Sequence, residues 1–101
     1  MERTAIVLNS KDNVATALAD LSAGDSIALE VDKNQLSVKL VNSIQFGHKF
    51  SLVDIKLGAT ILKYGEVIGE ATKDIKAGEH VHVHNVASTR GRGDVVKEAA
   101  K

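Results

Sequence analysis

The chain has 101 residues, with 13 basic and 13 acidic side chains, no net charge and no cysteine. A single domain of this size can bury a core but cannot enclose an active site, so we expect any chemistry to be shared across a subunit interface. The balanced charge argues against a nucleic-acid partner, and the lack of cysteine excludes disulfides and thiolate metal sites within the chain.

The first elements predicted along the chain are a strand and a helix. Residues 4–8 form a short apolar run that is typical of a strand. Ser10 or Asp12 is suited to cap a helix after it, and a helix N-terminus there would also attract an anion. The apolar residues of this helix would share one face: Val14, Ala17, Leu18 and Leu21. We expect no other substantial helix.

Strands are predicted in the rest of the chain. Residues 27–31 and 36–41 alternate apolar and polar side chains around Asp32-Lys33-Asn34, which indicates a hairpin. Further strands are expected at 59–63 and 80–86. Since aromatic residues are scarce, the core must be built from Val, Ile, Leu and Ala. The sequence therefore predicts a compact, mostly β domain of short strands with one short helix near the N-terminus.

One turn motif recurs three times along the chain. Each copy reads acidic, aliphatic, polar, small or aliphatic, glycine, and then the start of a strand. The copies are residues 20–27, 54–61 and 74–81. The glycine suits a turn with positive φ, a conformation that strains residues with a Cβ. Because the copies are unequally spaced, we interpret them as a local turn device and not as a solenoid repeat.

Three of the four histidines, His80, His82 and His84, alternate with valines. On a strand, Val81 and Val83 would point into the core and the histidines would line the opposite face. Histidines two residues apart would lie about 7 Å from each other, and those four apart about 13 Å. One metal ion could then take a neighbouring pair such as His82 and His84, but not all three on a straight strand.

The histidine face has three interpretations. A metal ion bound there would need further ligands, since Zn²⁺ or iron combines imidazole with carboxylate or thiolate. Acid–base catalysis or carboxylate binding is favoured over metal binding, because imidazole titrates near neutral pH and neighbouring rings suppress one another's protonation. The third interpretation is an exposed polar strand face without a function.

Polar residues beside glycines form a second group of candidates. Lys49 and Lys63 are of a type that holds a substrate carboxylate, while Tyr64 or His48 could donate a proton to a departing hydroxyl. Backbone at the neighbouring glycines can approach a ligand closely. Taken singly, each of these residues is more typical of a solvated or half-buried surface position.

The two ends of the chain carry little information about a site. Residues 88–101 are polar and contain glycine, and we expect a mobile tail there. The first residues lead into an apolar run too short for a signal peptide or a membrane span. We therefore expect a soluble cytoplasmic protein without a membrane partner, and exposed strand edges would permit a homo-oligomer.

Five motifs together identify a family resemblance. They are, in chain order, Asp12-Asn13-Val14-Ala15, Gly47-His48-Lys49-Phe50, Lys63-Tyr64-Gly65, Ile68-Gly69 and Gly78-Glu79-His80-Val81-His82-Val83-His84-Asn85. Over about residues 4–87 the chain resembles the amino-terminal domain of the altronate and galactarate dehydratase family, an SAF-type module of the β-clip class. The resemblance implies an SAF-like domain at residues 1–87, followed by the tail.

The resemblance also implies an activity. Members of this family are hydro-lyases that remove water from a sugar acid to give a 2-keto-3-deoxy product, with assistance from Fe²⁺ or Mn²⁺. We therefore expect the small subunit of a split dehydratase, which forms one wall of a site whose metal ligands and base lie mainly on a large subunit. The isolated chain would be inactive. Two alternatives stay open: the small subunit of a sulfolactate sulfo-lyase, and a non-catalytic SAF-type binding or scaffolding module.

Residue roles follow from residue type together with the family motifs. Dehydration of a hydroxy acid needs a proton removed next to the carboxylate and a proton or metal ion at the leaving hydroxyl. We expect His82 and His84 to transfer protons or approach the metal ion, with Tyr64 as a further catalytic candidate. The expected substrate-binding residues are His48, Lys49, Lys63 and Asn85.

Overall fold

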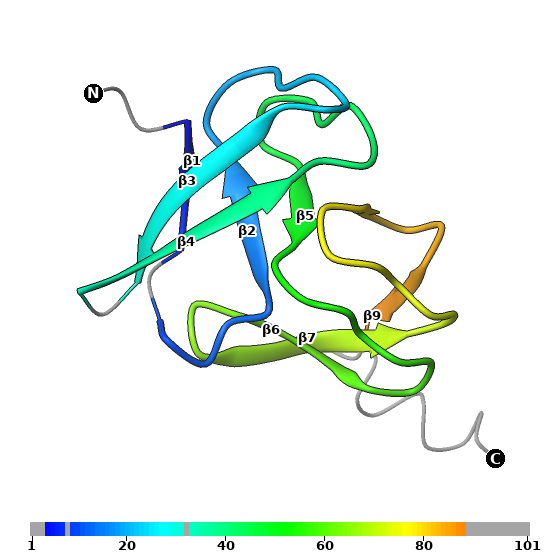
Figure 1. The fold of residues 1–101 in the computed structure, drawn as a ribbon. Helices are drawn as coiled ribbons and strands as arrows, with labels where there is room; N and C mark the ends of the chain where they lie inside the picture. Colours follow the sequence, from blue (N-terminus) through cyan, green and yellow to red (C-terminus); the bar gives the residue numbers. More distant parts are fainter. Residues whose placement is uncertain (1–3, 8, 32, 89–101) are drawn as a thin grey trace, which may run out of the picture.

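Short strands make up the part of the chain that the computed structural model describes, which is residues 4–7, 9–31 and 33–88 (Figure 1). Nine strands are found there: β1 (Ala5–Ile6), β2 (Val14–Ala17), β3 (Ser26–Val31), β4 (Asn34–Lys39), β5 (Lys49–Ser51), β6 (Thr60–Lys63), β7 (Glu66–Ala71), β8 (His80–Val81) and β9 (Val86–Ser88). The prediction of a mostly β fold is confirmed. The predicted tail lies outside the described residues from position 89 onward.

The strands form three small antiparallel sheets (Figure 1). The first has the order β1-β2-β5-β8, the second is the hairpin β3-β4, and the third has the order β6-β7-β9. The hairpin was predicted, and its register pairs Ser26 with Lys39 and Val31 with Asn34. The first sheet joins distant parts of the chain, since β2, β5 and β8 are far apart in sequence.

The predicted helix near the N-terminus is wrong, because residues 14–17 form β2 in the middle of the first sheet. Both faces of β2 are covered. Ala15 and Ala17 belong to one buried cluster, while Val14 belongs to a second cluster on the opposite face. A strand buried on both faces is apolar at nearly every position, and such a run is easily mistaken for one face of a helix.

Asp12 and Asn13 have a different role from the predicted helix cap. The Asp12 carboxylate accepts hydrogen bonds from the backbone N–H groups of Tyr64 and Gly65, both at 2.8 Å. The Asn13 side chain accepts one from Leu62 N–H at 2.8 Å and donates one to the Thr60 carbonyl at 2.9 Å. These two side chains therefore fasten the β6-β7 hairpin to the first sheet.

The core is divided into two clusters by the first sheet. One cluster contains Phe50 and Ile44, and the other contains Ile61, Ile75 and Val81. All five side chains are at most 1 % exposed. Opposed residues of antiparallel strands point to the same face, so the register places Thr16 and Lys49 on the Val81 side.

The repeated turn is confirmed, and it occurs four times instead of three. Gly24, Gly58 and Gly78 have φ values of 93°, 87° and 87°, and Gly47 has a φ of 85°. Residues 43–50 thus form a further copy. This copy is not apparent from the sequence, because serine stands in the acidic position and phenylalanine precedes the glycine.

The four turn copies associate in two pairs. An isolated bridge joins Leu21 to Ile44, and a second joins Ile55 to Ile75. Each turn glycine donates its N–H to a carbonyl three residues before the partner copy, at 2.7 to 2.9 Å. The pairs are Gly24 to Leu40, Gly47 to Ala17, Gly58 to Ala71 and Gly78 to Ser51. Each pair of turns is therefore related by an approximate two-fold axis.

The acidic residue that begins three of the turn copies accepts a hydrogen bond from the partner turn. Asp54 accepts a hydrogen bond from Ala77 N–H and Asp74 accepts one from Leu57 N–H, both at 2.9 Å. Asp20 accepts one from Phe46 N–H at the same distance. Each carboxylate satisfies a backbone donor of the partner turn, which would otherwise depend on solvent. No helix within the described ranges is long and apolar enough to cross a membrane.

Gly78→Ala should destabilise the chain far more than Gly24→Ala. Both glycines have positive φ, but an added Cβ would clash with the Lys39 carbonyl oxygen at Gly78 and would meet nothing within 4 Å at Gly24. We expect the free energy of unfolding to fall by about 1–2 kcal/mol for Gly24→Ala and by at least about 3 kcal/mol for Gly78→Ala. Urea unfolding measures both. Equal losses would show that Gly78 is required for its φ alone.

Candidate active site

The strand predicted for residues 80–86 is interrupted after Val81. β8 ends there, residues 82–85 turn, and β9 starts at Val86. Val81 is fully buried, as predicted, but Val83 is 80 % exposed and does not enter the core. The prediction for Val83 is wrong because it assumed a straight strand.

Asn85 holds this turn together from inside. Its side chain is 0 % exposed. Its Oδ1 accepts a hydrogen bond from His82 N–H at 3.0 Å, and its Nδ2 donates one to the His80 carbonyl at 2.9 Å. Asn85 is a substrate-binding candidate from the sequence, but its side-chain amide is already hydrogen-bonded within the chain. These hydrogen bonds fix the backbone of His80 and His82.

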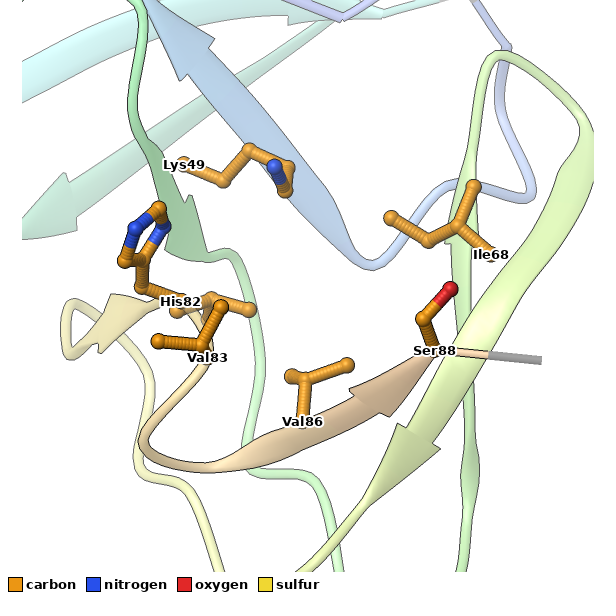
Figure 2. A pocket seen from close by; sticks show the side chains of 7 residues that line it. Lys49, Ile68, His82, Val83, Val86 and Ser88 are labelled. Carbon is orange, nitrogen blue, oxygen red and sulfur yellow. The ribbon is translucent and has the colours of Figure 1, made fainter. Parts of the chain in front are cut away.

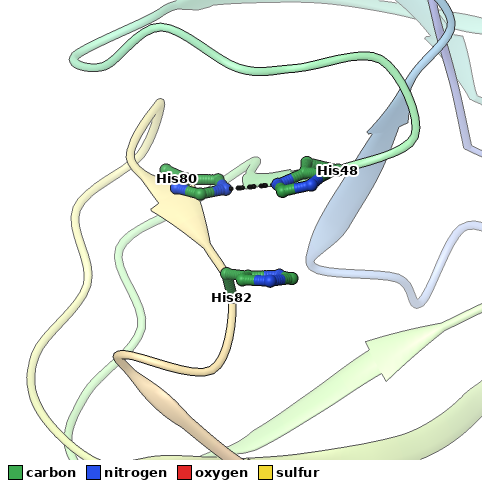
Figure 3. A group of neighbouring side chains, drawn as sticks. All are labelled: His48, His80 and His82. Atoms are coloured by element: carbon green, nitrogen blue, oxygen red, sulfur yellow. Dashed lines mark hydrogen bonds between the residues drawn. The ribbon is translucent and has the colours of Figure 1, made fainter.

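A cluster of three histidines, His48, His80 and His82, lies at the junction of β5 and β8 (Figure 3). The Nδ1 of His48 and the Nε2 of His80 are 2.9 Å apart, so the two rings share a hydrogen bond. The ring of His82 stacks on that of His48, with 4.5 Å between centroids and 17° between planes. One nitrogen from each ring can be chosen so that all three lie within 4.8 Å of one another.

The cluster arises from strand pairing and not from the alternation of histidines along the sequence. β5 pairs with β8 so that Phe50 lies opposite His80 and Lys49 opposite Val81. The same register places His48 opposite His82, and the His48 ring also reaches that of His80. Sequence analysis named His48 but did not place it with the other two. The signal was the unrecognised fourth turn, in which His48 holds the position directly after the glycine.

His84 lies at the edge of this group. Its ring centroid is 5.3 Å from that of His80, with the planes tilted by 35°. His84 is not part of the three-nitrogen group, so the pair His82 and His84 named from the sequence is not the arrangement that brings ring nitrogens closest together.

Lys49 lines a pocket of about 250 Å³ beside the cluster (Figure 2). The other lining residues are Ile68, Val81, His82, Val83, Val86 and Ser88. Burial lowers the pKa of Lys49, and the positive charge of Lys63 lowers it further. Lys63 thus acts on Lys49, and the pocket combines mainly apolar walls with one ammonium group.

Two further residues lie close to these lysines. Tyr64 sits in the β6-β7 turn with a φ of 54°, and its ring lies 4.9 Å from the Lys63 Nζ. The ring of Tyr64 thus contacts the ammonium group of Lys63. Thr16, opposite Lys49 on β2, has a buried hydroxyl with no hydrogen-bond partner in the described part of the chain. Sequence analysis missed Thr16, and an isolated threonine in an apolar run gave no signal.

Two histidines of the cluster, His80 and His82, have a lowered pKa, which disfavours their charged form. Burial lowers the pKa of His80, and the nearby His48, His84, His82 and Lys49 lower it further. Burial also lowers the pKa of His82, and the nearby His48, Lys49 and His84 lower it further. A neutral imidazole can accept a proton or coordinate a metal ion, so either chemistry is open to the cluster at neutral pH.

Comparison with known proteins gives the family. The model of the altronate/galactarate dehydratase SAF domain matches residues 3–89. Altronate dehydratase of Escherichia coli K12 is 49 % identical over 80 residues, and that of Bacillus subtilis 168 is 40 % identical over 80 residues. These matches cover 79 % of this chain but only 15 % of either enzyme, so the chain spans a small fraction of their length.

A shorter relative also matches. The alpha subunit of (2R)-sulfolactate sulfo-lyase from Paracoccus pantotrophus is 37 % identical over 59 residues, which are 58 % of this chain and 88 % of that subunit. With the SAF-domain model matching nearly all of the described residues, this chain belongs to the altronate/galactarate dehydratase SAF-domain family.

Proposed function

We propose that this chain forms one wall of the active site of a sugar-acid hydro-lyase, with the rest of the site on a larger partner. The observation that carries the proposal is the cluster of three histidines beside the Lys49 pocket. The similarity to altronate dehydratases supports the reaction class. The similarity to a protein named as the alpha subunit of a sulfolactate sulfo-lyase, of which the match covers 88 %, supports a larger partner.

Lys49 and Lys63 would bind the substrate carboxylate. Removal of the proton next to a carboxylate builds negative charge on the carboxylate oxygens, and a fixed ammonium group stabilises that charge more strongly in a partly buried site than in water. Lys49 is half-buried and already lies near a second positive charge. The unpartnered Thr16 hydroxyl on the same face is a further donor for the carboxylate.

The histidines would act at the leaving hydroxyl, either by donating a proton to it or by holding a metal ion that polarises it. The hydrogen bond between His48 and His80 requires at least one neutral ring, and burial lowers the pKa of the stacked His82. A protonated imidazole of this group can donate its proton to the leaving hydroxyl. His84 and Tyr64, both exposed, are proposed to assist from the edge of the site.

The walls of the pocket indicate what the partner must supply. Ile68, Val81, Val83 and Val86 offer no side-chain hydrogen bonds. A sugar acid carries several hydroxyl groups that lose water contacts on binding, and each needs a replacement partner. We propose that this chain holds the carboxylate end, while the large partner binds the hydroxyl groups and supplies the base.

A divalent iron or manganese ion would act as the cofactor, with further ligands on the large partner. When bound, the ion would polarise the leaving hydroxyl. In this chain His48, His80 and His82 are the residues that fit an ion, because their donor nitrogens converge. An all-nitrogen donor set suits Fe²⁺ better than Mn²⁺, which prefers oxygen ligands.

The alternative function is that of a small subunit of a sulfolactate sulfo-lyase. The supporting observation is length, since the match covers 88 % of the Paracoccus alpha subunit. Elimination of sulfite and elimination of water both need a bound carboxylate and a proton removed from carbon. The same lysines and histidines would therefore serve either leaving group.

The reaction can be tested by assaying the chain with its large partner. The tagged chain is co-expressed with the reading frames that flank its gene, purified, and supplied with altronate, galactarate or sulfolactate in separate reactions. We expect formation of a 2-keto-3-deoxy acid from altronate or galactarate. Release of sulfite alone would select the alternative, and inactivity toward all three acids would overturn the proposal.

Lys49→Met in the active complex should reduce kcat/KM for the sugar acid by roughly 10- to 100-fold, as expected for the loss of one charge-assisted hydrogen bond. Methionine keeps the length of the side chain and removes the charge. The matched control is Lys56→Met, at an exposed turn position outside the pocket. Steady-state kinetics of both variants measure the difference. A similar loss in both variants, or none in either, would contradict carboxylate binding by Lys49.

A further inference from the structure

We propose that His48, His80 and His82 form a binding site for one divalent transition-metal ion, to which this chain contributes three imidazole nitrogens. The site deepens the proposed function, because it assigns the metal ligands that this chain would contribute. It differs from the pair His82 and His84 that alternation along the sequence suggested.

The distances between the ring nitrogens fit a single ion. Two nitrogens bound at about 2.1 Å to one ion lie roughly 3.0 to 3.4 Å apart at angles between 90° and 109°. The nitrogens of His48 and His80 are 2.9 Å apart, and those of all three residues lie within 4.8 Å of one another. The His48–His80 pair needs almost no approach, while His82 must approach by about 1 to 2 Å.

Side-chain rotation can supply this approach, because the backbone of each histidine is already fixed. His48 N–H donates to the Gln45 carbonyl at 2.9 Å. His80 N–H donates to Asn42 Oδ1 at 2.9 Å, and His82 N–H donates to Asn85 Oδ1 at 3.0 Å. Binding would therefore order only the rings, which keeps its entropic cost small.

The arrangement of the rings shows which movements are needed. In Figure 3 the rings of His48 and His80 lie edge to edge, with His82 stacked on them. A metal ion lies in the plane of each imidazole that binds it, so the stacked rings must rotate until their nitrogen lone pairs converge. The ion would then replace the hydrogen bond between His48 and His80.

The charged neighbour of the cluster leaves space for a cation. Figure 2 shows the Lys49 side chain extending away from His82 toward Ile68. Three nitrogen ligands leave at least one coordination position open on a four- to six-coordinate ion. That position is available to water or to an oxygen atom of an acid whose carboxylate is bound by Lys49.

The experiment is a titration of the tag-free 101-residue chain with Co²⁺ and Zn²⁺, followed by visible absorption for Co²⁺ and by calorimetry for both. We expect one ion per chain and visible bands typical of nitrogen ligands. His48→Ala, His80→Ala and His82→Ala should each weaken binding by more than about tenfold, since loss of a residue that only supports a ligand already costs 10- to 100-fold.

His84→Ala is the matched control and should leave the affinity within about twofold, because His84 lies outside the three-nitrogen group. Circular dichroism and urea unfolding of each variant identify any loss that is caused by unfolding, and His48→Gln repeats the His48 test with a side chain of similar size. Binding that survives His48→Ala but is lost in His84→Ala would overturn the proposal, as would the absence of binding at millimolar ion. Because the titration uses no sugar acid, its outcome is independent of the assay for dehydration.

Discussion

The pairing of β5 with β8 is the constraint on which the candidate site depends. Ser51 N–H donates to the Glu79 carbonyl at 2.9 Å, and Gly78 N–H donates to the Ser51 carbonyl at 2.7 Å. These bonds set the register in which Phe50 faces His80. A shift of one residue would send His80 to the opposite face and separate it from His48. Gly78 can accept this close packing because it has no Cβ to meet the Lys39 carbonyl.

The parts of the fold that could be predicted are those whose sequence signal comes from neighbouring residues. The hairpin β3-β4 and the positive φ of Gly24, Gly58 and Gly78 follow from local patterns, because the responsible residues are neighbours along the chain. β2 was mistaken for a helix, because its burial on both faces comes from segments far away in sequence. Tertiary packing, and not local preference, decided its conformation.

The candidate site shows the same division between local and distant effects. The histidines at 80, 82 and 84 were recognised from their spacing, but their partner His48 is supplied by a strand pairing over 32 residues. The buried amide of Asn85 also ended β8 early, so that Val83 turned outward. A single sequence records neither a distant pairing nor the hydrogen bonds of a buried side chain, and these two effects set the geometry of the cluster.

The electrostatics of the cluster would link anion binding at Lys49 to protonation of the histidines. Four histidines and Lys49 influence one another, so each positive charge added to the group raises the cost of the next. An anion bound at Lys49 would relieve this repulsion and make protonation of a nearby ring easier. Binding of a carboxylate would thus prepare the histidines to deliver a proton. The apolar walls of the pocket offer no hydrogen bonds to the remaining polar groups of a sugar acid, so the proposed catalysis would require a partner that covers the open side.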